Sequence, residues 1–184
     1  MKYKFLFFFL LFSSLLSYSQ HPNFLGKSLG EPATVILSEL SKRGFDCARD
    51  WTIEGNHFFS YNGGKFDSIP NCHVTLKICQ ETNKIVNAHV TFPETSDTTI
   101  VQNQFELIKD MLCNRYGLNP DNCVSYDESK PVLFKYSNAS INIDKNSIHL
   151  SIYSKDNNHT LHLIYTDKLN KAEVDRKRSG VDDV

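Results

Sequence analysis

Residues 72–79 read Cys-His-Val-Thr-Leu-Lys-Ile-Cys, and after a turn at 81–83, residues 86–92 read Val-Asn-Ala-His-Val-Thr-Phe. Apolar and polar side chains alternate in both stretches, a pattern typical of β-strands with one buried face. The turn reads Glu-Thr-Asn, and Pro93 ends the second strand. We therefore predict an antiparallel hairpin with these residues on its core face: Cys72, Val74, Leu76, Ile78, Val86, Ala88, Val90 and Phe92.

Helical patterns lie on both sides of this hairpin. Between residues 31 and 43 the apolar side chains fall on one helical face, and Gly44 follows as a stop signal. Residues 101–116 carry an apolar stripe at i, i+4, i+7 and i+11, and Gly117 ends that helix. The two stripes consist of Ala33, Ile36, Leu37 and Leu40, and of Val101, Phe105, Ile108, Leu112 and Tyr116.

Strand patterns return after the second helix. Residues 131–136 and 140–144 are predicted to form a hairpin around Asn138-Ala139, and residues 148–152 and 161–165 form two further strands. The offset from Gly44 to Gly117 is 73 residues, and the offset from His73 to His149 is 76. Two similar offsets favour a duplicated unit.

The predicted fold is α+β: an antiparallel sheet with helices packed on one face, built from two tandem α-β-β-β units. One globular domain spans residues 20–167, with pseudo-repeats at about 24–93 and 94–167. Residues 168–184 form a charged C-terminal tail, interpreted as a short helix that frays.

Four segments carry a resemblance to a known family: Phe24-Leu25-Gly26, residues 40–45, residues 107–112 with Tyr116-Gly117, and residues 90–93. Together they resemble a family of small exported proteins from Gram-negative bacteria. The resemblance covers most of the mature chain and implies an exported location and a helix-plus-sheet fold. That family has no assigned activity, so the resemblance implies no site residue, cofactor or partner.

Residues 1–19 have the three parts of a secretory signal peptide. Lys2 and Lys4 supply the positive charge, residues 5–16 are apolar, and Ser17 and Ser19 place small side chains at positions −3 and −1. Twelve helical residues rise about 18 Å, well short of the roughly 30 Å hydrocarbon core of a bilayer. We therefore expect cleavage after Ser19, a periplasmic or extracellular location, and no integral membrane segment after processing.

Charge and cysteine content narrow the classes of partner. The whole chain has a formal net charge of −1, which becomes −3 without Lys2 and Lys4. The chain therefore lacks the basic excess that is typical of nucleic-acid binders. The five cysteines all lie in the predicted exported part, where disulfides persist. Their number is odd, and the sequence leaves the connectivity among Cys47, Cys72, Cys79, Cys113 and Cys123 open, with zero, one or two bridges.

The seven histidines show no strong metal-ligand spacing, and we predict neither a metal nor a cofactor. The sharpest constellation is His73 with His89, which share the predicted non-core face with Lys77. The alternative interpretation is an ordinary solvated sheet face. A Cys-His nucleophile built from Cys79 is the weaker option, because no local feature activates that thiol.

The aromatic segment from Trp51 to Tyr61 is predicted to end at a turn, Asn62-Gly63-Gly64. Alternation along it leaves an aromatic surplus on one surface, and exposed aromatic patches mark binding surfaces. Burial beneath the following loop is the alternative. The candidate binding residues are therefore Trp51, His57, Phe59, Tyr61, His73 and His89.

These observations favour an exported, non-catalytic binding domain whose partner is a protein, a peptide or a glycan. The alternative is a small envelope hydrolase whose site is assembled from distant residues.

We expect the exported protein to begin at Gln20. N-terminal sequencing and intact mass measure this directly. Recovery of the full-length chain from membranes would contradict the prediction.

Overall fold

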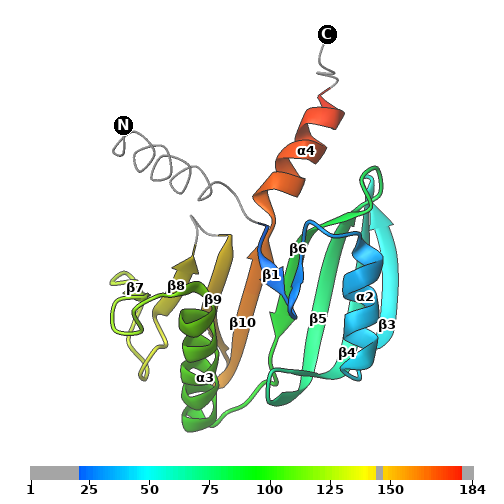
Figure 1. The fold of residues 1–184 in the computed structure, drawn as a ribbon. Coiled ribbons are helices and arrows are strands. Elements are labelled where there is room, and N and C mark those ends of the chain that lie inside the picture. Colours follow the sequence, from blue (N-terminus) through cyan, green and yellow to red (C-terminus); the bar gives the residue numbers. More distant parts are fainter. Residues whose placement is uncertain (1–20, 144–146, 180–184) are drawn as a thin grey trace, which may run out of the picture.

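An eight-stranded antiparallel sheet forms the centre of the computed structural model, which describes residues 21–143 and 147–179 (Figure 1). The predicted signal peptide and its cleavage position lie outside the described residues. The mixed α+β class and the antiparallel sheet are confirmed. Across the sheet the order is β3 (Asp46–Ile53), β4 (Asn56–Phe66), β5 (Ile69–Cys79), β6 (Lys84–Thr91), β10 (Asn158–Thr166), β9 (Ile148–Lys155), β8 (Ala139–Ile143) and β7 (Val124–Tyr126).

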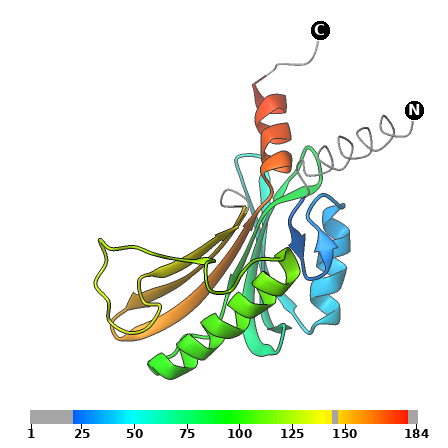
Figure 2. The ribbon, with the colours of Figure 1, turned by 60° about the vertical axis from the view of Figure 1, so that its left-hand side comes forward.

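Two helices, α2 (Ala33–Lys42) and α3 (Thr98–Tyr116), cover the same face of this sheet (Figure 2). The Asp97 side chain caps α3 by accepting a hydrogen bond from the Thr99 backbone N–H, and Gly117 ends it at a φ of 63°. Both helices bury their predicted stripes against the inward side chains of the strands. The fully buried helix residues include Ile36, Leu40, Val101, Phe105, Ile108 and Leu112.

Strands β6 and β10 join the two halves of the sheet. Their antiparallel register pairs Val90 with Leu163, and the flanking pairs are His89 with Ile164 and Thr91 with His162. Val90 and Leu163 are fully buried, so one core continues across the junction.

In the pairing of β5 with β6, a register shift between Lys77 and Ile78 changes which side chains at the start of β6 point into the core. Ile78 pairs with Ile85, and both side chains belong to the main core. Val86, predicted on that core face, instead forms a separate buried cluster with Cys79 and with Val174 of α4 (Lys168–Arg178). The prediction for Val86 was wrong because a β-bulge interrupts the simple alternation.

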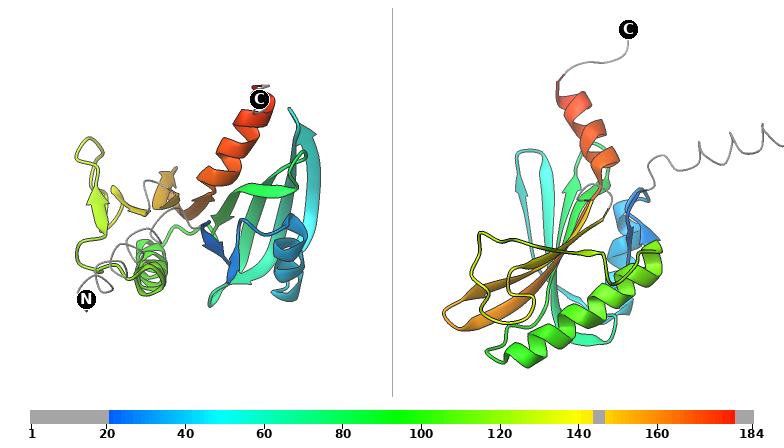
Figure 3. Two further views of the ribbon diagram at one scale, coloured as in Figure 1. Left: turned by 45° about the horizontal axis from the view of Figure 1, so that its top comes forward. Right: turned by 90° about the vertical axis from the view of Figure 1, so that its left-hand side faces the viewer.

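The third helix, α4, lies at one end of the sheet, on the side opposite α2 and α3 (Figure 3). Residues 168–184 are interpreted from their charge as a tail with a short helix, and in the structure Lys168–Arg178 form a helix that docks on the sheet. Lys84 Nζ lies 3.1 Å from Glu173 Oε2, and the Arg178 guanidinium donates to the Glu54 carbonyl at 2.8 Å. A single apolar residue, Val174, was enough to anchor a helix because these polar contacts flank it.

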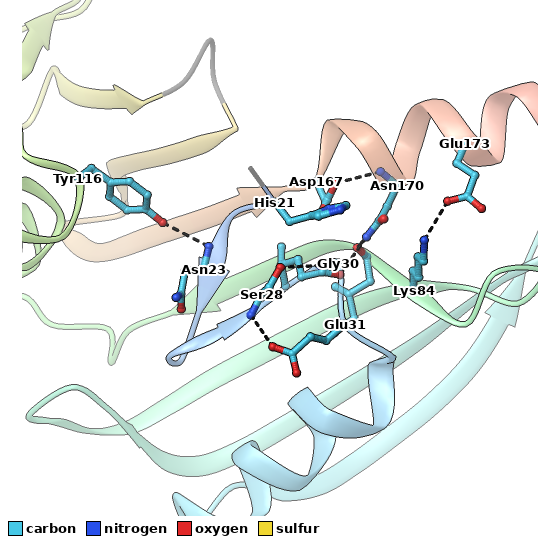
Figure 4. Close-up of polar contacts among 12 residues, drawn as sticks. His21, Asn23, Ser28, Gly30, Glu31, Lys84, Tyr116, Asp167, Asn170 and Glu173 are labelled. Atoms are coloured by element: carbon cyan, nitrogen blue, oxygen red, sulfur yellow. Dashed lines mark hydrogen bonds and ion pairs between the residues drawn. The ribbon is translucent and has the colours of Figure 1, made fainter. Parts of the chain in front are cut away.

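A buried polar cluster holds the start of α4 against the N-terminal segment (Figure 4). Asp167 is fully buried and accepts hydrogen bonds from the Asn170 backbone N–H and from His21 Nδ1, the latter at 2.6 Å. The Asn170 side-chain amide donates to the carbonyls of Leu29 and Ile85, both at 2.9 Å. Leu29 follows the short ribbon of β1 (Asn23–Phe24) and β2 (Lys27–Ser28), so this cluster ties both ends of the described chain to β6.

Two predicted elements differ from the structure. Residues 131–136 are not a strand, and β8 pairs instead with the short strand β7. Asn62-Gly63-Gly64 is not a turn but a bulged part of β4, where a Cβ on Gly64 would lie 2.1 Å from the Phe45 ring. The hairpin turn lies earlier, at Glu54-Gly55, where both residues have positive φ.

One edge strand is irregular. The pairing of β3 with β4 shifts between Cys47 and Arg49, and nearly every side chain of β3 is exposed.

We expect Leu112→Ala to lower the free energy of unfolding by about 2–5 kcal/mol, because truncation of a fully buried leucine leaves a cavity. Leu107→Ala on the exposed side of α3 is the matched control, with a loss under about 0.5 kcal/mol. Urea denaturation measures both. Equal losses would show that the helix buries a different face.

Candidate binding face

The face of the sheet opposite α2 and α3 carries four histidines, and we call it the open face. Alternation places His73 on β5, His89 on β6, His162 on β10 and His149 on β9 there, because the residues on either side of each point into the core. Other open-face residues are Ser60, Thr75, Lys77, Asn87, Thr91, Ser151, Tyr153 and Ile164.

His89 and His162 meet at the centre of this face. Their Nε2 and Nδ1 atoms lie 2.8 Å apart, which is hydrogen-bond distance, and their ring centroids are 5.0 Å apart. The contact follows from the β6–β10 register, which makes these residues diagonal neighbours on one face. Tyr153 meets His162 edge-on, with ring centroids 6.2 Å apart.

The two outer histidines have their own partners. His73 Nε2 lies 2.8 Å from the Ser60 hydroxyl oxygen on β4. His149 contacts Asn142 Oδ1 through Nδ1 at 2.6 Å and the Ser151 hydroxyl through Nε2 at 3.1 Å. These neutral partners fix the orientation of each ring.

Partial burial lowers the pKa of all four histidines. Desolvation, with smaller contributions from His162 and His73, lowers the pKa of His89 to about 4. Desolvation also lowers the pKa of His73 and His162, and that of His149 with a contribution from Lys130. Near neutral pH the imidazoles are therefore uncharged, and each can donate and accept hydrogen bonds.

The open face is hollowed beside these histidines. A shallow depression of about 350 Å³ is lined by His89, His149, Ser151, Tyr153, His162 and Ile164. A second one, of about 360 Å³, lies between β9 and the connection from β7 to β8. Tyr153 is 58% exposed, and on that connection Val132 and Leu133 are 73% and 65% exposed.

Trp51, one of the predicted binding residues, also lies on the open face. Its ring stacks on Phe58 with centroids 5.4 Å apart and planes 7° apart. The Arg49 guanidinium lies 5.2 Å from the Trp51 ring centroid, and Lys77 Nζ lies 6.0 Å from that of Phe58. The open face thus has an aromatic, cationic end in addition to its histidine centre.

The other aromatic candidates point to the helix side. Tyr61 is buried in the main core, and Phe59 packs against it. The His57 and Phe59 rings lie 4.2 Å apart, and His57 Nε2 lies 3.2 Å from Asp50 Oδ2. The structure therefore brings His73 and His89 together and places Trp51 on the same face, but it separates His57, Phe59 and Tyr61 from them.

The polar groups that meet on the open face are imidazoles, hydroxyls and an amide. Among residues 21–143 and 147–179, no three His, Cys, Asp or Glu side chains are grouped to hold a metal ion. Cys79 is fully buried beneath Val86 and Val174, so its thiol does not reach the solvent at this face. The open face instead offers neutral hydrogen-bonding groups beside aromatic rings.

Sequence reasoning missed His162, His149, Tyr153 and Phe58 as site residues. The signal was present, because His149 and His162 alternate with buried residues as His73 and His89 do. The same 73-residue offset that relates Gly44 to Gly117 also relates His89 to His162.

Comparisons of the chain with protein-family models, with curated proteins and with solved structures found no match. In the part of the chain that the structure describes, no helix combines the length and apolar character needed to cross a membrane.

We expect the free energy of unfolding to fall between pH 7 and pH 5. The unfolded chain, with histidine pKa values near 6.5, takes up protons in this window before the folded chain does, so stability present above pH 7 is lost as the pH falls. After allowance for solvent screening, His89 contributes about 1–2 kcal/mol of this loss.

Thermal melts at both pH values measure the effect. His89→Gln should reduce the drop in Tm by roughly 2–6 °C. Thr75 is the cross-strand partner of His89 on β5. Thr75→Val changes the open face without removing an imidazole and should keep the full drop in Tm. An unchanged pH dependence in His89→Gln would contradict the assignment.

Proposed function

We propose that this protein is an exported, non-catalytic domain that binds a partner protein through the open face. The single observation that carries the proposal is the strip of partly exposed, uncharged imidazole and aromatic groups across the face that α2 and α3 leave uncovered. His89, His162 and Tyr153 form its centre.

Several features support a protein as the partner. The depression beside His89 and His162 is shallow and is lined by residues of three neighbouring strands, β6, β10 and β9, a shape that suits a broad partner surface. Tyrosine, tryptophan and arginine are enriched in protein interfaces, and Tyr153, Trp51 and Arg49 supply them here. A peptide or a glycan would use the same aromatic rings over a smaller area.

Two further parts of the proposal concern origin and location. The basic and apolar residues at 2–16 and the small residues at 17 and 19 support export to the periplasm or beyond. The element order, in which α2 and α3 are each followed by four strands, supports a tandem duplication. Each unit would then have one more strand than the sequence pattern predicts.

The alternative hydrolase gains no specific support from the geometry. The imidazoles of His89 and His162 contact each other, and His73 and His149 contact hydroxyl or amide groups. No described contact joins any of the four to a carboxylate or a thiol, the groups that orient or receive protons in nucleophilic sites.

The test introduces a photo-crosslinking amino acid at one position of the protein at a time. Crosslinking is carried out in the cells that produce the protein. Thr91 and Tyr153 probe the open face, and Asn103 on the exposed side of α3 is the control. We expect one discrete protein adduct from both open-face positions and none from Asn103, with the partner then identified by mass spectrometry.

Affinity for that identified partner provides the second measurement. Tyr153→Ala should weaken binding at least about tenfold, as is typical for an exposed aromatic at an interface centre. Leu107→Ala, also an exposed apolar side chain, should leave it unchanged. Adducts from Asn103 alone, or an unaltered affinity in Tyr153→Ala, would overturn the proposal.

A further inference from the structure

Two cysteine thiols lie in contact where α3 ends and the chain turns toward β7. The Sγ atoms of Cys113 and Cys123 are 3.1 Å apart. Cys113 is buried in the last turns of α3, and Cys123 is half-buried immediately before β7. A shift of about 1 Å would bring the two sulfur atoms to the bonded distance of roughly 2.05 Å.

The backbone between these cysteines is already folded back on itself. Gly117 adopts the left-handed conformation at the end of α3, and the Leu118 N–H donates to the Cys113 carbonyl at 2.9 Å. Asn122 N–H donates to the Asn119 carbonyl at 3.1 Å. The reversal holds both cysteine backbones close before any covalent bond forms.

The other three cysteines have different surroundings. Cys72 is buried and its thiol donates to the Ile69 carbonyl at 3.3 Å, and Cys79 lies beneath Val174. Cys47 is exposed on β3. Of the five cysteines, all of which lie in the described part of the chain, Cys113 and Cys123 are the pair whose sulfur atoms contact each other.

We propose that Cys113 and Cys123 form a disulfide in the oxidised protein, and that Cys47, Cys72 and Cys79 remain thiols. The oxidant is a disulfide of the thiol-exchange class. One S–S bond forms in the protein, the S–S bond of the oxidant breaks, and two electrons and two protons pass to the oxidant as two thiols.

The surroundings of the two cysteines set the order of the steps. Cys123 is the accessible partner, so its thiolate attacks the oxidant first and forms a mixed disulfide. Cys113 then attacks the Cys123 sulfur and expels the oxidant's second thiolate. Burial raises the pKa of Cys113 to about 12, which makes it the poorer first nucleophile.

The bond would connect α3 to the edge of the sheet. β7 pairs with β8 through only three residue pairs, Val124 with Ile141, Ser125 with Ser140 and Tyr126 with Ala139. A covalent link one residue before Val124 shortens the free chain that leads into this strand. The disulfide therefore stabilises the folded protein by lowering the entropy of the unfolded chain, and it does so beside the shortest strand of the eight-stranded sheet.

Peptide mapping tests the connectivity directly, because trypsin places each of the five cysteines in a different peptide. The purified chain is equilibrated with oxidised and reduced glutathione, alkylated under denaturing conditions and digested without reduction. We expect residues 110–115 linked to residues 116–135, three alkylated cysteines, and release of the two peptides by dithiothreitol. Alkylation of all five cysteines, or a link that involves another cysteine, would overturn the proposal.

Thermal stability supplies an independent readout. Dithiothreitol should lower the Tm of the oxidised protein by about 5–10 °C. Cys123→Ser, which alters only a half-buried position, should melt like the reduced protein and should not respond to the reductant. Cys47→Ser is the matched control and should keep the full response. A reductant effect that persists in Cys123→Ser would also overturn the proposal.

Discussion

The pairing of β6 with β10 is the interaction on which the rest of the structure depends. It joins two four-stranded halves into one sheet, and it makes the core under α2 continuous with the core under α3. The same register determines the contact at the centre of the open face. His89 and His162 are sequence neighbours of the buried pair Val90 and Leu163, so their side chains point to the opposite face of the sheet. The core and the open face are two sides of one set of backbone hydrogen bonds.

Much of this fold could be predicted from local patterns. The stripe of α3, its Gly117 terminus and the alternation of β5, β9 and β10 are strong signals, since each depends on residues close in sequence. Features that depend on tertiary contacts are not visible in such patterns. Gly64 is needed for close approach of Phe45 rather than for a turn, and α4 docks because Val174 finds Cys79 and Val86 across the chain.

The candidate site was predictable only in part. Alternation correctly places His73 and His89 on one face, but it does not say which strand of the second half lies beside β6. That neighbour supplies His162, so the central contact of the open face depends on a pairing between residues 73 positions apart. The aromatic candidates divided between faces because the turn at Glu54-Gly55 pairs Trp51 with Phe58 and sends Tyr61 into the core.

The bulge at the start of β3 has a consequence for self-association. A strand from a second molecule laid along this edge would meet the shift between Cys47 and Arg49 and the charges of Asp46, Arg49 and Asp50. Irregular, charged edges resist such pairing, and the opposite edge strand, β7, is only three residues long. The molecule therefore exposes a broad β-surface while its edges remain poor templates for fibril growth.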